Sequence, residues 1–108
     1  MGVSKPIDDK SVLMQKAVTI NGTSDEVCVT CPGTHTYIVD ISTGTASVQL
    51  FFKPYGFANY RPLGATITAV AQTVIVYECP YGASYQDTVT NIGGGAVVTS
   101  SIAYAGGK

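Results

Sequence analysis

Apolar and polar side chains alternate along much of this chain with a period of two residues. Residues 45–52 read TASVQLFF, so Ala46, Val48 and Leu50 share one face of an extended segment and polar side chains share the other. This alternation is typical of a half-buried strand, because successive side chains of a strand point to opposite faces. The run VIVY at residues 74–77 is β-branched and aromatic, which also favours a strand. No segment keeps a helical period over three turns.

Turn residues separate the extended segments at short and regular intervals. We expect strands at residues 15–20, 26–31, 37–41, 45–52, 65–70, 73–78, 84–90 and 96–104. About eight short strands predict an all-β protein, namely an antiparallel β-sandwich of jelly-roll or immunoglobulin-like kind. The connection at residues 53–62 (KPYGFANYRP) holds two prolines and cannot be a central strand.

A run of three glycines lies between the last two expected strands. Glycine adopts the positive φ that tight hairpin loops require, and the loop reads NIGGGA at residues 91–96. We therefore expect the strand that ends near Thr90 to pair antiparallel with the strand that starts near Ala96.

The chain has 108 residues, which suits one domain with a modest core. Residues 1–14 show little periodicity, so we expect them to be a flexible N-terminal arm. Residues 15–108 are then the single β-sandwich domain.

The composition excludes several classes of function. Hydrophobic residues make up 45% and charged residues 12% of the chain, which indicates a folded protein with a surface rich in uncharged polar groups. The net charge of −1, without a basic cluster, argues against nucleic-acid binding. No segment approaches the roughly 20 apolar residues of a membrane span, and none resembles a signal peptide. We expect a polypeptide that is made in the cytoplasm and binds no membrane.

Three cysteines and the one histidine raise the question of a metal site. Cys28, Cys31, His35 and Cys79 could supply three thiolates and an imidazole to a tetrahedral zinc ion. However, Cys28 and Cys31 point to opposite faces if the strand continues between them, and the odd count argues against a disulfide framework. We expect free thiols and no metal or other cofactor.

No catalytic motif is present. His35 is the only imidazole that could act as a general base, and the chain has no nucleophile elbow, phosphate-binding glycine loop or zinc-protease motif. Asp40, Glu78 and Asp87 fall on or beside expected strands, where a solvent-facing position is the default for a carboxylate. The sequence therefore predicts a protein that is not an enzyme.

The aromatic connection is the best candidate for a binding surface. Tyr55, Phe57, Tyr60 and Arg61 have the composition that is enriched in the cores of protein interfaces. The same rings could instead cover one end of the sandwich core, and these two roles are compatible. A third possibility is a platform on which sugar rings stack, although the loop lacks acidic side chains to bind hydroxyl groups.

Residues 45–104 resemble the small all-β virion proteins of tailed bacteriophages, especially head decoration or cement proteins and head-fibre modules. Short Thr- and Val-rich strands joined by glycine turns carry this resemblance, as in TASVQL at residues 45–50, TVIVYE at 73–78 and VTNIGGGAVVT at 89–99.

The resemblance implies a protein of the virion without enzymatic activity, which binds and stabilises the head shell. It implies a homo-oligomer, commonly a trimer, whose partner is the major capsid protein or another virion protein. The alternative is a carbohydrate-binding or host-recognition module that uses Tyr55, Phe57 and Tyr60.

Overall fold

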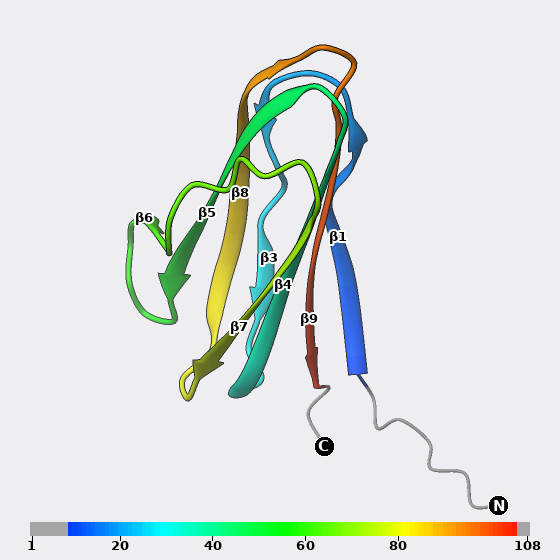
Figure 1. Cartoon of the computed structure of the whole chain (residues 1–108). Helices are drawn as coiled ribbons and strands as arrows, with labels where there is room; N and C mark the ends of the chain where they lie inside the picture. The colour runs from blue at the N-terminus through cyan, green and yellow to red at the C-terminus, as the bar shows by residue number, and fades with distance from the viewer. Residues whose placement is uncertain (1–8, 106–108) are drawn as a thin grey trace, which may run out of the picture.

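Two antiparallel sheets face one another in the computed structural model, which describes residues 9–105 and the side chains of residues 11–104 (Figure 1). The first sheet contains, in order, β1 (Asp9–Val18), β9 (Val97–Ala105), β4 (Gly33–Ser42) and β7 (Gln72–Cys79). In the second sheet, β2 (Gly22–Thr23) and β3 (Val27–Val29) both pair with β8 (Ala83–Gly93), which is followed by β5 (Thr45–Pro54) and β6 (Arg61–Pro62). The predicted all-β antiparallel sandwich is confirmed.

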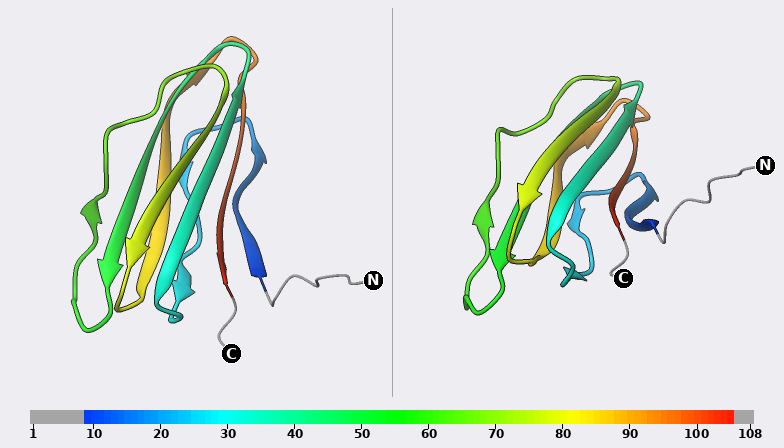
Figure 2. Two further views of the ribbon diagram at one scale, coloured as in Figure 1. Left: turned by 60° about the horizontal axis from the view of Figure 1, so that its bottom comes forward. Right: turned by 90° about the horizontal axis from the view of Figure 1, so that it is seen from below.

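The pairing of the strands is nested. β1 pairs with β9, β2 and β3 pair with β8, β4 pairs with β7, and β5 pairs with β6. The chain thus forms one long antiparallel hairpin that is rolled up, so that β4 also lies beside β9 and β5 beside β8. This order is that of a jelly roll, one of the two sandwich types that the sequence predicts. Figure 2 shows the two layers in a tilted view and from below.

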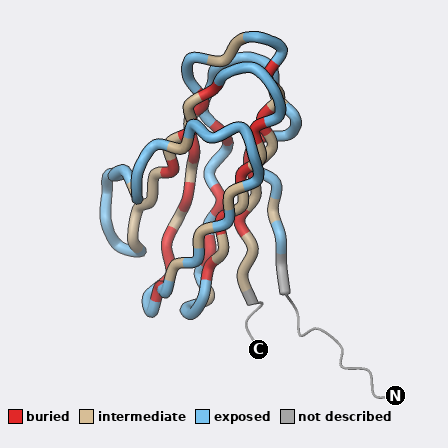
Figure 3. The backbone as a smooth tube through the Cα atoms, viewed as in Figure 1, coloured by how far each residue is buried: buried red, intermediate tan, exposed pale blue. Residues whose placement is uncertain are grey.

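Alternation along the strands determines the core. Buried positions alternate with more exposed ones along β4, β5 and β8 (Figure 3). In β5, Ala46, Val48 and Leu50 are buried as predicted, and in β3 Val27 and Val29 are buried while Cys28 is exposed. The inner faces of the two sheets therefore supply one continuous apolar core.

The predicted hairpin between residues 84–90 and 96–104 is wrong. β8 lies in the second sheet and β9 in the first, so the glycine loop crosses between sheets at the end where the β4–β5 turn also crosses (Figure 1). Gly94 and Gly95 do have the expected positive φ of 65° and 79°. The glycines permit a tight loop, but they do not determine whether the flanking strands pair.

The strand predicted at residues 65–70 is also wrong. Only Ile67 pairs in this segment, through a single bridge in which its N–H and C=O bond the C=O and N–H of Val48 at 2.8 and 2.9 Å. Gly64, with φ of 76°, turns the chain just before the segment. The segment must then cross from the second sheet to the first, which leaves too few residues for a ladder.

The domain begins earlier than expected. Residues 9–14 were assigned to the arm, but they form the first half of β1 and pair with β9 from Asp9↔Ala105 onwards. Residues 1–8 of the predicted arm lie outside the described residues.

Candidate functional site

The β5–β6 loop and the β7–β8 corner lie at the same end of the sandwich (Figure 1), and both carry exposed aromatic residues. The two segments are joined by a hydrogen bond from the Tyr55 N–H to the Gly82 carbonyl at 3.3 Å. Tyr55 and Phe57 on the loop are 77% and 68% exposed, and Tyr81 at the corner is 56% exposed. We call these three residues the aromatic end.

Shallow hollows make the aromatic end continuous with the rest of the loop. One hollow of about 380 Å³ lies between Pro54 and the three rings. A neighbouring one of about 270 Å³ is lined by Phe52, Pro54, Phe57, Ala58, Asn59 and Arg61. The result is a broad, uneven, mostly apolar surface that includes Arg61.

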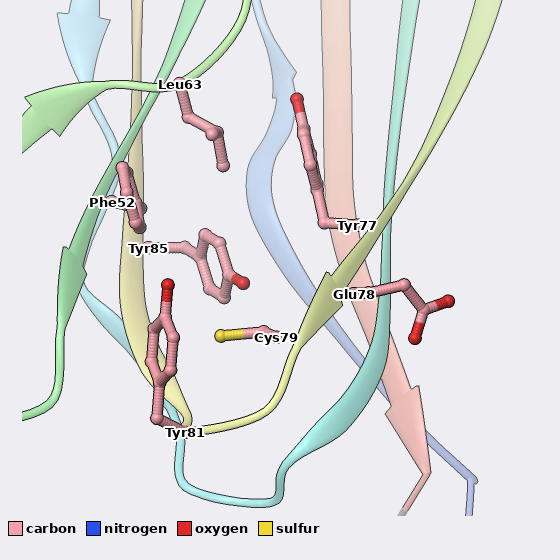
Figure 4. A pocket seen from close by; sticks show the side chains of 7 residues that line it. All are labelled: Phe52, Leu63, Tyr77, Glu78, Cys79, Tyr81 and Tyr85. Atoms are coloured by element: carbon pink, nitrogen blue, oxygen red, sulfur yellow. The ribbon is translucent and has the colours of Figure 1, made fainter.

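A smaller pocket lies between the two sheets next to the aromatic end (Figure 4). It is lined by Phe52, Leu63, Tyr77, Glu78, Cys79, Tyr81 and Tyr85 and has a volume of about 130 Å³. Tyr85 and Cys79 point into it, whereas the carboxylate of Glu78 points away. Sites for small organic ligands are usually roughly 300–1,000 Å³. The pocket between the sheets is therefore too small to enclose such a ligand.

Tyr60 holds the β5–β6 loop against the second sheet. Its hydroxyl donates a hydrogen bond to the Glu26 carboxylate, and Lys53 Nζ lies 3.4 Å from the same carboxylate oxygen and 5.1 Å from the Tyr60 ring centroid. Burial, together with Glu26, raises the pKa of the Tyr60 hydroxyl, which therefore stays protonated and donates. Of the four residues predicted for an interface, Tyr55, Phe57 and Arg61 are exposed, and Tyr60 is half-buried and anchors the loop.

This anchor makes a testable prediction about Glu26. The hydrogen bond from Tyr60, followed by the charge of Lys53, holds the pKa of Glu26 below its ordinary value of 4.5. Because the folded-state pKa is lowered, the contribution to stability is present above the unfolded-state pKa and is lost as the pH falls through the folded-state pKa. We expect Tyr60→Phe to raise the pKa of Glu26, as measured by NMR titration of its side-chain carboxyl carbon.

The matched control is Tyr55→Phe, which removes a hydroxyl from a more exposed ring of the same loop. This variant should leave the Glu26 titration unchanged. An equal shift in both variants, or a shift in neither, would contradict the role assigned to Tyr60.

A carboxyl group is enclosed in the core. The Asp87 side chain is fully buried and accepts hydrogen bonds from Gln15 Nε2 at 2.9 Å, the Tyr37 hydroxyl at 2.6 Å and the Ser100 hydroxyl at 2.5 Å. Burial and the Asp87 carboxylate raise the pKa of Tyr37, so its hydroxyl remains a donor. Asp87 was predicted to face solvent, and that prediction is wrong. The cluster joins β8 to three strands of the opposite sheet, which is a structural role.

His35 is buried and both of its ring nitrogens are occupied. Nε2 lies 2.7 Å from the Cys31 carbonyl and Nδ1 lies 2.7 Å from the Tyr85 hydroxyl. A carbonyl only accepts, so Nε2 carries the hydrogen. Burial raises the pKa of Tyr85, whose hydroxyl then donates to Nδ1. This imidazole is committed to holding the β3–β4 turn against β8 and cannot reach an external substrate.

Comparison of sequences found no relative of this chain, whereas comparison of structures found a protein of similar fold. No family model and no curated protein matches the chain. The fold is similar to the crystal structure of SPBc2 prophage-derived protein YomS, with a TM-score of 0.67 and 12% identity over 95% of this chain and 100% of that one. A likeness to the structure of infectious bursal disease virus Gx strain covers 94% of this chain and 32% of that one, at 14% identity and a TM-score of 0.39, which is too low to argue from.

The four metal-site candidates do not converge. Cys28 is exposed, and its Sγ lies 3.1 Å from the Ser84 hydroxyl. Cys31 is half-buried, and Cys79 is buried and lines the pocket between the two sheets. No group of three or more possible ligands is close enough to hold a metal ion within the described part of the chain. Residues 9–105 also contain no helix that could span a membrane.

Sequence reasoning missed Tyr81, the third ring of the aromatic end. Tyr81 lies 24 residues or more beyond Phe57 and Tyr55, so only the strand order brings it to them. The exposure of Tyr81 could have been predicted from its neighbours in the sequence. Pro80 and Gly82 indicate a turn, and an aromatic residue in a turn at a strand end has little core to cover.

Proposed function

We propose that the chain is a non-enzymatic structural protein of a phage virion, and specifically a decoration or cement protein that binds the head shell. The observation that carries the proposal is the aromatic end, where Tyr55, Phe57 and Tyr81 are exposed on the jelly roll. Large exposed rings in a cluster are typical of the energetic centre of a protein interface.

Two further observations support this function. Two of the buried polar residues, Asp87 and His35, are hydrogen-bonded within the core, so neither offers a reactive group to a substrate. A structural neighbour that is covered over its full length is named as a prophage-derived protein, which is consistent with a phage origin for a chain of the same fold. The virion is then the site of action.

The test is co-sedimentation of the purified protein with heads isolated from the virus that encodes it. We expect saturable binding by the wild type, and a loss of affinity of about 100-fold or more in a Tyr55→Ser and Phe57→Ser double variant, because two central aromatic contacts are removed. The matched control is Val70→Ser, since Val70 is an apolar residue that is 52% exposed and lies away from the aromatic end. Unchanged binding by the double variant, or no binding by the wild type, would refute the proposal.

A carbohydrate-binding module is the second candidate, favoured by rings from two loops that lie on one surface beside Asn59 and Arg61. The same variants separate the two functions on a glycan array. Glycan binding that is lost in the double variant, without binding to heads, would establish the second candidate in place of the first.

A further inference from the structure

β7 is an unprotected edge strand. It pairs with β4 on one side, and nothing in residues 9–105 pairs with it on the other. Its eight residues, QTVIVYEC, keep a regular register with β4 from Gly33↔Cys79 to Asp40↔Gln72 and carry one charged side chain, that of Glu78. A regular apolar edge of this kind is a template for pairing with another strand.

The other three sheet edges all carry features that oppose such pairing. β1 has two register shifts, a positive φ of 53° at Ala17 and the exposed Lys16 beside it. β6 has two residues, one of which is Pro62, and the opposite edge is divided between β2 and β3, with two and three residues. Bulges, charge, proline and short strands are the devices by which proteins block edge pairing. β7 has eight residues with no proline and no register shift, and its one charge, that of Glu78, lies at the penultimate position of the strand.

The orientation of the β7 backbone follows from one hydrogen bond. The Ile41 N–H donates to the Ala71 carbonyl at 3.2 Å, and this pair continues the β4–β7 register by one residue. Hydrogen-bonded and non-hydrogen-bonded pairs alternate in an antiparallel ladder. The main-chain groups of Thr73, Ile75 and Tyr77 therefore point to β4. Those of Gln72, Val74, Val76 and Glu78 point to the open edge.

We propose that β7 pairs antiparallel with β7 of a second copy of this chain, about a two-fold axis at Ile75. In this register Val74 lies opposite Val76 of the partner subunit, and Gln72 lies opposite Glu78 of the partner subunit. The free main-chain groups then form about eight hydrogen bonds. Val74 and Val76, which are 55% and 56% exposed on the outer face, are covered by each other.

Charge selects this register over its neighbours. A shift by two residues keeps the faces matched but places Glu78 opposite a valine, so its carboxylate gains no polar partner beyond the Thr34 hydroxyl of its own chain, which already donates to it at 3.1 Å. In the proposed register Glu78 faces an amide, and the two glutamates lie at opposite ends of the paired strands. A two-fold contact closes at two copies. The inferred assembly is thus a dimer rather than the trimer that the family resemblance implies, and it is independent of whether the shell is the partner.

Sedimentation velocity over a range of concentrations tests the dimer. We expect the wild type to be dimeric and Val76→Lys to raise the dissociation constant by at least about tenfold, because each substitution acts twice across the two-fold axis. The matched control is Leu13→Lys, since Leu13 is 50% exposed on β1, the opposite edge of the same sheet. It should leave the dimer intact. Both variants should keep the circular dichroism spectrum of the wild type.

A monomeric wild type, or equal weakening by the two lysines, would overturn the inference. A wild type that is monomeric alone, but whose binding to heads is lost in Val76→Lys, would assign the edge to a strand of the shell protein instead. Failure of the dimer does not affect the test of the aromatic end, because the Tyr55 and Phe57 variants change a different surface.

Disulfide cross-linking tests the register. In a Cys28→Ser background, chains with Val74→Cys are mixed with chains carrying Val76→Cys and oxidised. The two positions face each other at about 5.5 Å between Cα atoms, which suits a disulfide. We expect the mixture to cross-link and each variant alone to stay uncross-linked. Rapid cross-linking of Val76→Cys to itself would exclude the register.

Discussion

Replacing Asp87 with alanine is expected to lower the free energy of unfolding by about 3 kcal/mol or more. The carboxyl group is the common acceptor for the side chains of Gln15, Tyr37 and Ser100, and all four residues are buried. The substitution leaves the hydroxyls of Tyr37 and Ser100 without this acceptor, whereas Gln15 Nε2 keeps the Asp87 main-chain carbonyl at 3.3 Å. Each buried donor left without an acceptor costs about 1–3 kcal/mol, and the small side chain also leaves a cavity between the sheets. Since small domains are stable by roughly 5–15 kcal/mol, this loss is a large fraction of the total.

Urea unfolding followed by circular dichroism measures this effect. The matched control is Asp40→Ala, because Asp40 lies on β4 between the buried Val39 and Ile41 and points away from the core. We expect the control to change the free energy of unfolding by no more than about 0.5 kcal/mol. If Asp87→Ala were as stable as Asp40→Ala, the polar cluster would not be holding the sheets together.

The single donors should matter less than the acceptor. Tyr37→Phe leaves the carboxyl group with two of its partners, so we expect a loss of about 1 kcal/mol, and the same holds for Ser100→Ala. This ordering distinguishes a shared acceptor from a set of independent contacts.

The position of Asp87 could have been predicted from the alternation. Tyr85, Asp87 and Val89 share one face of β8, and the two neighbours of Asp87 on that face are buried. The prediction that Asp87 faces solvent relied on its being a carboxylate and not on the alternation of side chains along the strand. Residue type failed because the cost of burying a carboxyl group is offset by donors from β1, β4 and β9, which are far away in the sequence. Such partners are visible only once the strand order is known.

Strand positions were predictable and strand partners were not. Side-chain alternation is a local property, so it identified β5, β7 and most of β4, β8 and β9 from the sequence. Pairing depends on which sheet each strand enters, and in a jelly roll most successive long strands enter opposite sheets. The glycine loop at residues 93–95 was therefore assigned to a hairpin although it joins the two layers.

At the aromatic end, too, local properties were predictable from the sequence, whereas contacts between remote segments were not. The composition of residues 53–62 left two roles open, a contact surface and a cover over one end of the core, and the structure leaves Tyr55 and Phe57 exposed there. Composition did not indicate that Tyr60 bonds Glu26, or that Tyr81 joins the surface, because both contacts cross between segments remote in the sequence. A candidate contact loop was thus predictable, but its shape and its third ring were not.

Gly44 is the residue at which the two crossing turns meet, and Gly44→Ala is expected to cost about 3 kcal/mol or more. A Cβ atom at this position would lie 2.2 Å from the Gly93 carbonyl oxygen and 2.7 Å from that of Gly94. Both contacts are with backbone, so relief requires the β4–β5 and β8–β9 turns to move apart. The positive φ of 62° adds the strain of a left-handed residue with a side chain.

Gly95→Ala separates crowding from backbone strain. Gly95 has a similar φ of 79° and lies in the same pair of turns, but nothing would come within 4 Å of an added Cβ. We expect this control to cost about 1 kcal/mol, the strain alone. The difference between the two variants in urea unfolding then measures the close approach of the turns. Equal losses of stability in the two variants would mean that the β4–β5 and β8–β9 turns are not packed tightly against each other. Their close contact would then not stabilise this end of the sandwich.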